Sequence, residues 1–308
     1  MNKKIAVIGA GNVGASCALY LAEANIADIV MVDIIEGVPQ GKGLDLTQAG
    51  PVRGYNAKVY GSNKFADIKG ADIVVMTAGL PRKPGMSRED LLNMNADIIS
   101  SVAKEIKKHA PGSFVIMVSN PLDIMTFHMQ KKTGFPKNRV FGQAGVLDST
   151  RFRAFVAMEL DVAMTDVEAM VLGGHGDTMV PLPRYTTVSG IPISELIPKD
   201  RIKAISERTR MGGGEIVKLL KTGSAYYAPA AATVDMCRAV FSDEKKLLPA
   251  SAHLNGEYGI TDIYIGVPVV LGAKGVERII ELKLSKAELT ALQGSAKTYR
   301  EHLKILGY

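Results

Sequence analysis

Cysteine and aromatic residues are scarce in this sequence of 308 residues, which has two cysteines, no tryptophan, and aromatic residues at 6% of its positions. Two isolated cysteines cannot by themselves form a disulfide framework or a metal site. Cys17 and Cys237 both lie in apolar segments with many small residues. We therefore expect two buried free thiols, and we expect no resident metal ion.

A long hydrophobic run is also absent. No stretch of about 18 uncharged apolar residues occurs, so we expect no transmembrane helix. The apolar segment near the N-terminus, residues 5–9, is too short for the core of a signal peptide, and no cleavage site with small residues follows it. We therefore predict a cytoplasmic protein without a membrane partner.

A concentrated patch of positive charge is missing as well, although 37 basic and 31 acidic residues give a net charge of +6. The basic residues are scattered, whereas a nucleic-acid site concentrates them on one face or element. We therefore expect no nucleic-acid partner, and a mildly basic balance suits an enzyme that binds anions. The length and the 47% hydrophobic content fit two globular domains.

The first half of the chain alternates short apolar runs with helical stretches. The runs contain many Val, Ile and Met residues with little polar alternation, which is typical of strands buried on both faces of a parallel sheet. The sequence therefore predicts an α/β domain over residues 1–145, with a Rossmann-type doubly wound parallel sheet. Its predicted strands are residues 4–8, 29–33, 57–60, 72–77, 114–119 and 139–141, and its predicted helices include residues 12–23 and 89–108.

The pattern changes after about residue 145. We predict an α+β substrate domain over residues 146–308, which shares a cleft with the first domain because no linker separates them. Its predicted helices are residues 149–159, 201–220, 225–242 and 286–305, and its extended runs are residues 166–172, 179–181, 247–254 and 263–271.

A glycine-rich turn follows the first predicted strand. Gly9 permits a tight turn, Gly11 lets the backbone approach a pyrophosphate, and Gly14 lets helix and strand pack closely. Asp33 ends the second predicted strand, where a carboxylate accepts hydrogen bonds from the adenosine ribose and repels a 2′-phosphate. These features favour NAD over NADP, and the alternative is an ordinary glycine turn with a surface aspartate.

The chemistry is predicted around His175, which is flanked by Gly174 and Gly176 after an extended apolar run. Asp148 and Arg151 are three residues apart near the start of a predicted helix, so both can lie on one face. Each residue also has an ordinary alternative. A lone histidine is usually structural, Asp148 can be an N-cap, and Arg151 can be a surface arginine.

Five segments occur together in an order that resembles the lactate/malate dehydrogenase family. They are the glycine fingerprint and residues 78–88 (AGLPRKPGMSR), 118–121 (VSNP), 147–151 (LDSTR) and 174–177 (GHGD). The resemblance covers essentially the whole chain, and its combination of motifs is highly specific. Within the family, the sequence looks most like the lactate-dehydrogenase-like branch of prokaryotic malate dehydrogenases.

The resemblance implies a role for each polar residue of these segments. His175 would remove the hydroxyl proton while hydride passes to the nicotinamide, and Asp148 would orient the imidazole and stabilise its protonated form. Arg151 would bind the C1 carboxylate of the substrate through two parallel hydrogen bonds. Arg88 would polarise the substrate carbonyl, and Arg82 would bind a second carboxylate, both from a loop that closes over the cleft.

Arg82 separates the two activities of the family, because lactate dehydrogenases typically have glutamine there. An arginine beside pyruvate would be left unpaired, so the resemblance implies oxidation of (S)-malate to oxaloacetate, a reaction of the tricarboxylic acid cycle. The alternatives are an L-lactate dehydrogenase and a merely solvated arginine. Ala225 falls near a place where lactate dehydrogenases tend to have threonine, and a small residue there would leave room for the dicarboxylate.

The resemblance also implies the cofactor contacts and the assembly. Asn120 would lie near the substrate and the nicotinamide ribose at the carboxyl end of the sheet. Relatives form dimers or tetramers, and we expect a homotetramer. Two further alternatives are a NAD-dependent glycosidase, which would need a metal site, and a binding protein that has lost the chemistry. The implied NAD-binding residues are Gly9, Gly11, Asn12, Gly14, Asp33, Asn95, Val118 and Asn120.

Overall fold

A single large sheet runs through both halves of the chain. The computed structural model describes residues 3–80 and 87–308, with the side chain of Arg88 excepted. The large sheet has nine strands in the order β14-β13-β12-β6-β5-β4-β1-β2-β3, and two small sheets have the orders β11-β10-β7 and β8-β9. The strands are β1 (Lys4–Ile8), β2 (Asp28–Val32), β3 (Val59–Ser62), β4 (Ile73–Met76), β5 (Phe114–Met117), β6 (Val140–Gly142), β7 (Val167–Glu168), β8 (Val171–Leu172), β9 (Val180–Pro181), β10 (Thr187–Val188), β11 (Ile191–Pro192), β12 (Lys246–Asn255), β13 (Thr261–Gly272) and β14 (Gly275–Ile279).

Strands β1 to β6 form the parallel part of this sheet. Their order, β3-β2-β1-β4-β5-β6, is that of a doubly wound fold, in which the chain changes direction between β1 and β4. Ile5, Ala6 and Val7 of β1 are fully buried, as expected for a strand covered on both faces. The predicted Rossmann-type sheet is therefore confirmed.

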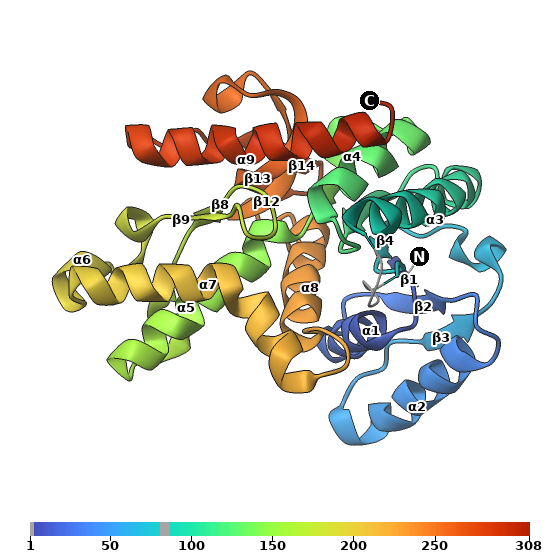
Figure 1. Ribbon diagram of the computed structural model, residues 1–308. Helices are drawn as coiled ribbons and strands as arrows, with labels where there is room; N and C mark the ends of the chain where they lie inside the picture. The colour runs from blue at the N-terminus through green and yellow to red at the C-terminus, as the bar shows by residue number, and fades with distance from the viewer. Residues whose placement is uncertain (1–2, 81–86) are drawn as a thin grey trace.

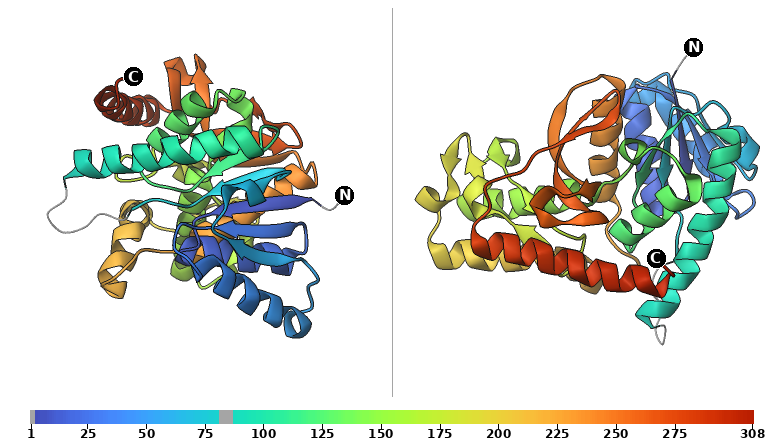
Figure 2. Two further views of the ribbon diagram at one scale, coloured as in Figure 1. Left: turned by 90° about the vertical axis from the view of Figure 1, so that its right-hand side faces the viewer. Right: turned by 90° about the horizontal axis from the view of Figure 1, so that it is seen from above.

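Helices cover both faces of the sheet (Figures 1 and 2). Because such crossovers are right-handed, α1 and α2 lie on one face and α3 and α4 on the other. Helix α1 packs against α8, and α4 packs against α3 and α9. The helices are α1 (Asn12–Ala24), α2 (Val38–Arg53), α3 (Arg88–His109), α4 (Leu122–Thr133), α5 (Ala144–Leu160), α6 (Ile193–Leu196), α7 (Lys199–Leu220), α8 (Tyr227–Phe241) and α9 (Lys286–Ile305).

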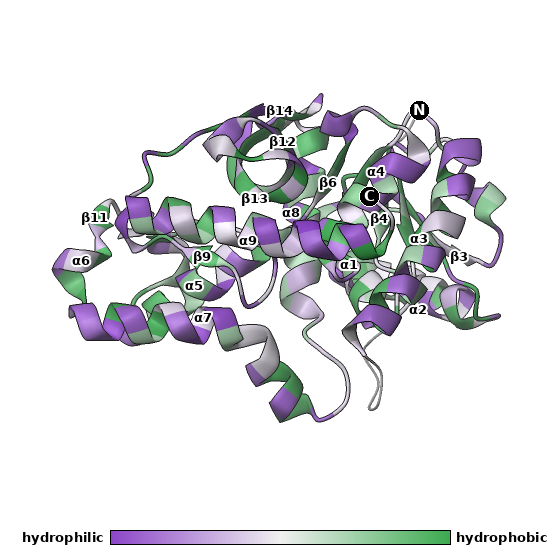
Figure 3. Ribbon diagram, turned by 45° about the horizontal axis from the view of Figure 1, so that its top comes forward, coloured by the Kyte–Doolittle hydropathy of each residue, from purple (hydrophilic) through white to green (hydrophobic). Residues whose placement is uncertain are grey.

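The second half joins the first through β12, which pairs antiparallel with β6 at Ser251 and Gly142. The sequence predicts β12 and β13 as part of a following α+β domain, and the structure shows that they extend the first sheet. This pairing covers the edge that β6 would otherwise expose. In Figure 3, α7 and α9 carry both hydrophilic and hydrophobic residues, as expected for helices that cover one face of a core.

Helix α5 begins at Ala144, earlier than the predicted start at residue 149. Gly145 disfavours a helix by propensity, but a Cβ there would lie 2.8 Å from both Pro249 Cβ and the carbonyl oxygen of Val171. Close packing therefore requires glycine at this position, and α5 includes it despite its low helix propensity. Asp148 consequently lies in the second helical turn, so the predicted position at the helix start was wrong and Asp148 is not an N-cap.

The two cysteines are free and buried, as the sequence predicts. Cys17 lies on α1 and Cys237 on α8, the two helices that pack together. Burial raises the pKa of the Cys17 thiol to about 12, so this thiol is not a reactive thiolate at neutral pH. Within the described ranges, no helix is both long and apolar enough to cross a membrane.

Candidate active site

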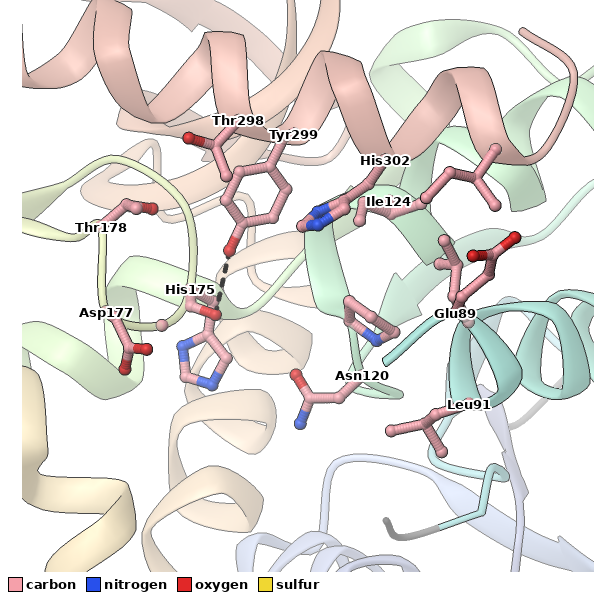
Figure 4. Close-up of a pocket in the computed structure, with 14 residues that line it drawn as sticks. Glu89, Leu91, Asn120, Ile124, His175, Asp177, Thr178, Thr298, Tyr299 and His302 are labelled. Atoms are coloured by element: carbon pink, nitrogen blue, oxygen red, sulfur yellow. Dashed lines mark hydrogen bonds between the residues drawn. The ribbon is translucent and has the colours of Figure 1, made fainter. Parts of the chain in front are cut away.

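The candidate site lies at the carboxyl end of the parallel strands, where the loops after β1, β2, β4 and β5 meet. Two adjoining cavities of about 440 Å³ and about 290 Å³ are both lined by His175 and Asn120. Figure 4 shows the imidazole of His175 and the amide of Asn120 directed toward the same space, with Tyr299 of α9 beside the backbone of His175. Cavities at this point of a doubly wound fold are typical ligand sites.

The glycine turn after β1 forms the cofactor side of the site. Gly9 has a φ of 101°, and a Cβ on Gly14 would lie 1.8 Å from the carbonyl oxygen of Gly9. Both positions therefore require glycine, the first for its backbone conformation and the second for a close approach. At Gly11 a Cβ would meet nothing within 4 Å. Gly11 caps α1 without a side-chain hydrogen bond, so the N–H groups that begin with Asn12 can face a phosphate.

Asp33 follows β2, and its carboxylate is fixed by the main chain. It accepts hydrogen bonds from the N–H groups of Ala10 at 2.6 Å and Ile35 at 3.0 Å. A carboxylate has about four acceptor positions, so capacity for ribose hydroxyls is left. Lys42 of α2, which the sequence analysis did not single out, donates to the carbonyl oxygen of Ala10 at 2.6 Å. Its charge beside the glycine turn suits a pyrophosphate.

Asn95 connects two loops on the cofactor side. Its side chain is buried, its Oδ1 accepts from the N–H of Leu80 at 2.8 Å, and its Nδ2 donates to the carbonyl oxygen of Asn120 at 2.8 Å. Both ends of the amide therefore shape the backbone around the site. Val118 is buried just after β5, whereas Asn120 is exposed and lines both cavities.

His175, Asp148 and Arg151 form one hydrogen-bonded group. His175 Nδ1 lies 2.9 Å from Asp148 Oδ2, and Arg151 Nη1 donates to Asp148 Oδ1 at 3.2 Å. The side chains of His175 and Arg151 are each 12% exposed, and that of Asp148 is 2% exposed. Because Nδ1 faces the carboxylate, Nε2 is the ring nitrogen that can exchange a proton with a substrate.

The backbone around His175 is held by two helices from different parts of the chain. The N–H of His175 donates to Asp123 Oδ2 of α4 at 2.8 Å, and its carbonyl oxygen accepts from Tyr299 Oη of α9 at 3.2 Å. The preceding N–H, of Gly174, donates to Ser295 Oγ of α9 at 2.9 Å. A Cβ on Gly174 would lie 2.1 Å from the Tyr299 ring, so only glycine permits this approach.

The charges around His175 determine its protonation. Burial lowers the pKa of His175, but the charge of Asp148 and the hydrogen bond to it outweigh burial, so the pKa lies above the ordinary value. Burial also lowers the pKa of Arg151 and is partly offset by Asp148, yet an arginine stays charged at neutral pH. The group therefore combines an imidazole whose pKa is raised with a fixed positive charge.

A run of three glycines in α7, residues 212–214, leaves space beside Arg151. A Cβ on Gly212 would lie 3.2 Å from Arg151 Cδ, and one on Gly213 would lie 3.6 Å from Arg151 Nη2. Among the described residues, the buried Nε of Arg151 has no hydrogen-bond partner. The space and the free donor suit a carboxylate bound to the guanidinium. Arg210 and Ala225 line the same cavity.

The side chains of the two predicted loop arginines, Arg82 and Arg88, are not among the parts of the chain that the structure describes. Arg82 lies outside the described residues, and only the backbone of Arg88 is described, as the first residue of α3. Ser87 caps that helix by accepting from the N–H of Asp90 at 3.0 Å. The roles of Arg82 and Arg88 stay predictions.

Both halves of the chain match domains of one protein family. Residues 3–142 match the NAD binding domain of lactate/malate dehydrogenase, and residues 145–306 match its alpha/beta C-terminal domain. The chain belongs to the lactate/malate dehydrogenase family. Among relatives, the malate dehydrogenase of Roseiflexus sp. (strain RS-1) is 56% identical over 306 residues, which is 99% of each chain.

Solved structures of lactate/malate dehydrogenases are similar over almost the whole chain. Malate dehydrogenase from Cryptosporidium parvum has a TM-score of 0.97 and 44% identity, covering 100% of this chain and 99% of that one. Lactate dehydrogenase from the same organism, complexed with lactic acid and nicotinamide adenine dinucleotide, has a TM-score of 0.96 and 45% identity, covering 100% and 98%. The backbone therefore identifies the family but does not separate malate from lactate members.

Some residues of this dehydrogenase site gave little signal in the sequence. Asp123, Lys42 and Tyr299 are single polar residues whose neighbours in the site are distant along the chain. Only the glycines at 212–214 stand out, because three consecutive glycines disfavour a helix and so indicate a close approach. Within residues 3–80 and 87–308, no group of three or more His, Cys, Asp or Glu side chains could hold a metal ion.

Proposed function

We propose that this chain catalyses the reversible, NAD-dependent oxidation of (S)-malate to oxaloacetate. The observation that carries the proposal is the group of His175, Asp148 and Arg151 in a cavity beside the glycine turn. Oxidation of a 2-hydroxy acid needs a base to remove the hydroxyl proton, a carboxylate that orients the base, and a cation that binds the carboxylate of the substrate. The relatives named malate dehydrogenase support the choice of substrate.

In malate oxidation, Arg151 binds the C1 carboxylate and His175 Nε2 takes the proton of the C2 hydroxyl. Asp148 keeps the imidazole oriented and stabilises the imidazolium that forms. Bound NAD supplies the acceptor for the hydride. In the reverse direction the imidazolium returns its proton to the carbonyl oxygen of oxaloacetate. The residues proposed to hold the cofactor are Gly9, Gly11, Asn12, Gly14, Asp33, Asn95, Val118 and Asn120.

The second carboxylate of the substrate is assigned to Arg82, and polarisation of the carbonyl to Arg88. The second candidate function is L-lactate dehydrogenase, because a lactate dehydrogenase from Cryptosporidium parvum is as similar in backbone as a malate dehydrogenase. The arginine at position 82 favours malate, since pyruvate has no group to pair with it.

The test is NADH oxidation with oxaloacetate and with pyruvate in parallel, for the parent chain and for Arg82→Gln. We expect the parent to prefer oxaloacetate by at least about 100-fold in kcat/KM, the order expected when a charge that recognises the substrate is left without its partner. In Arg82→Gln, oxaloacetate turnover should fall much further than pyruvate turnover. If the parent prefers pyruvate, the chain is a lactate dehydrogenase. If Arg82→Gln loses oxaloacetate and pyruvate turnover equally, Arg82 does not recognise the second carboxylate.

The assembly and location are proposed with the function. We propose a homotetramer in the cytoplasm, with residues 1–145 as the NAD-binding domain and residues 146–308 as the substrate domain. The two family matches, over residues 3–142 and 145–306, support this division of the chain. Light scattering after size-exclusion chromatography would measure the mass of the assembly. A mass equal to two chains would contradict the tetramer and show a dimer.

A further inference from the structure

One buried carboxylate in the site has no part in the reaction described above. Asp123 is the second residue of α4, and it is 1% exposed. Its Oδ2 accepts the hydrogen bond from the N–H of His175 at 2.8 Å, and its Oδ1 accepts from Ser251 Oγ of β12 at 2.6 Å. The carboxylate therefore connects α4, the His175 loop and the large sheet.

We propose that Asp123 is a positioning residue for the proton-transferring base, fixing the backbone of His175 while Asp148 fixes its imidazole. The inference rests on the proposed function of His175. Two anchors are needed because the hydrogen bond at Nδ1 restrains one end of the side chain only. If the backbone moved, Nε2 would move with it, and displacements near 1 Å can reduce a rate about 100-fold.

The position of Asp123 in the chain couples the base to the substrate side of the cavity. The loop after β5 places the Asn120 side chain in both cavities, and α4 begins at Leu122 directly after it. The first turn of this helix therefore carries Asp123, which is hydrogen-bonded to the backbone of His175, and it directly follows the segment that carries Asn120. A shift of this turn would change the distance between Asn120 and His175.

The surrounding sheet is built to keep the carboxylate in place. A Cβ on Gly142 of β6 would lie 2.4 Å from Leu122 Cδ2 and 3.0 Å from Ser251 Cβ. Glycine at this position therefore lets α4 and β12 approach closely enough for Ser251 to reach Asp123. Burying a carboxylate is costly, and burial raises the pKa of Asp123 to about 6 despite its hydrogen bonds from Ser251 and His175. Such a group is more typical of a functional site than of a core.

Asp123 also contributes to the electrostatic surroundings of His175. Its negative charge favours the imidazolium, in the same direction as Asp148, while Arg151 opposes it. The other titratable or charged groups that line the cavities with His175 come from its own loop and from α3, α7 and α9, namely Asp177, Glu89, Arg210, Tyr299 and His302. Removing the charge of Asp123 while keeping its shape should therefore lower the pKa of His175.

The experiment compares Asp123→Asn with Asp123→Ala in the full chain. The asparagine Oδ1 can still accept from the N–H of His175, and its Nδ2 can donate to Ser251 Oγ, whereas alanine leaves both donors without this acceptor. Active sites are counted by NADH fluorescence titration. We expect Asp123→Ala to lower kcat for oxaloacetate roughly 10- to 100-fold with KM changed much less, and Asp123→Asn to restore most of kcat.

The pH profile of kcat/KM for malate oxidation is the second readout. Oxidation needs neutral His175, so activity rises as pH rises through the pKa of this group. In Asp123→Asn that rise should move to lower pH by roughly half a unit or more, because a nearby negative charge is lost. Asp262→Asn is the matched control, since Asp262 pairs with His253 at 3.0 Å and lines neither cavity of the site. Its kcat and pH profile should equal those of the parent.

Two results would overturn the inference, namely parent-like kcat in Asp123→Ala, or an unshifted profile in Asp123→Asn. If Asp123→Ala does not fold, the Asp123→Asn profile decides alone. His175→Asn in the same series separates this inference from the proposed function. If His175→Asn stays active, His175 is not the base, and the proposed function of His175 and this inference both fail. If His175→Asn is inactive while the Asp123 variants behave like the parent, only the role proposed for Asp123 fails.

Discussion

The glycine turn and the His175 loop both place a few atoms accurately, but they do so by different means. In the turn, Gly14 contacts Gly9 only five positions away, and the conformation depends on two glycines in one strand–turn–helix unit. In the loop, His175 forms hydrogen bonds with Asp148 of α5, Asp123 of α4 and Tyr299 of α9, which lie 27, 52 and 124 positions away along the chain. The glycine turn is therefore a local structure, whereas the position of His175 depends on the packing of several elements.

This difference predicts that the two sides can be damaged separately. A change in the turn should affect NADH binding and the first domain, because its contacts are within that domain. A change at the base should affect turnover and leave NADH binding intact, because the hydrogen bonds of His175 within the described residues go to Asp123, Asp148 and Tyr299 and not to the glycine turn. Substitutions on each side test whether NADH binding and turnover can be lost separately.

The largest effect is expected for His175→Asn. This change removes the proton-transferring nitrogen, so turnover of oxaloacetate should fall by about 100- to 10,000-fold, while the dissociation constant of NADH stays within a few-fold of the parent. Stopped-flow turnover and fluorescence titration measure the two quantities. Loss of NADH binding together with turnover would show that the two sides are not independent.

A smaller effect, on the other side, is expected for Gly14→Ala. Its Cβ would lie 1.8 Å from the carbonyl oxygen of Gly9, so the turn must shift, and the free energy of unfolding should fall by about 1–3 kcal/mol with weaker NADH binding. Gly11→Ala is the comparison variant, because its Cβ meets nothing within 4 Å. It should keep parent stability in urea and still weaken NADH binding, since the methyl group occupies the approach to the phosphates. Parent-like NADH affinity in Gly11→Ala would place the pyrophosphate elsewhere.

The smallest effects are expected in the glycine run of α7. At Gly214 a Cβ would meet nothing within 4 Å, so Gly214→Ala should raise the free energy of unfolding by about 0.5–1 kcal/mol through helix propensity. At Gly212 a Cβ would lie 3.2 Å from Arg151 Cδ, so Gly212→Ala should displace the guanidinium and raise KM for oxaloacetate several-fold. Urea unfolding and steady-state kinetics measure these changes. Equal KM values in the two variants would mean that this helix does not limit the carboxylate site.

The sequence predicted the parallel sheet and the glycine turn well because the signal is local. Apolar runs placed the six parallel strands, and the glycine turn and Asp33 followed from their positions at strand ends. It was less accurate where packing overrides propensity. Helix α5 begins at Ala144 although Gly145 disfavours a helix by propensity, and the close approach of Pro249 leaves room only for glycine there. The predicted helix from residue 149 was therefore too short, because a glycine near a helix start weakens the helical pattern in the sequence.

The family resemblance brought His175, Asp148 and Arg151 together in the prediction, but spacing along the chain could not have given their geometry. The residues that hold His175 in place were not found at all. Asp123 and Tyr299 reach the base from α4 and α9, and each is an ordinary polar residue of a helix when viewed in sequence. Finding them requires knowing which helices lie beside the loop.

The sequence by itself determined the doubly wound sheet and the glycine turn, because short-range sterics and the alternation of apolar runs with helical stretches suffice for these. The grouping of His175, Asp148 and Arg151 was implied by the family resemblance. Only the tertiary structure decided that β12 and β13 extend the first sheet and bring Ser251 to Asp123. It also decided that the N–H, the carbonyl oxygen and the imidazole of His175 are held by three different helices. These contacts join residues distant along the chain, and their energy exists only after the helices have packed on the sheet.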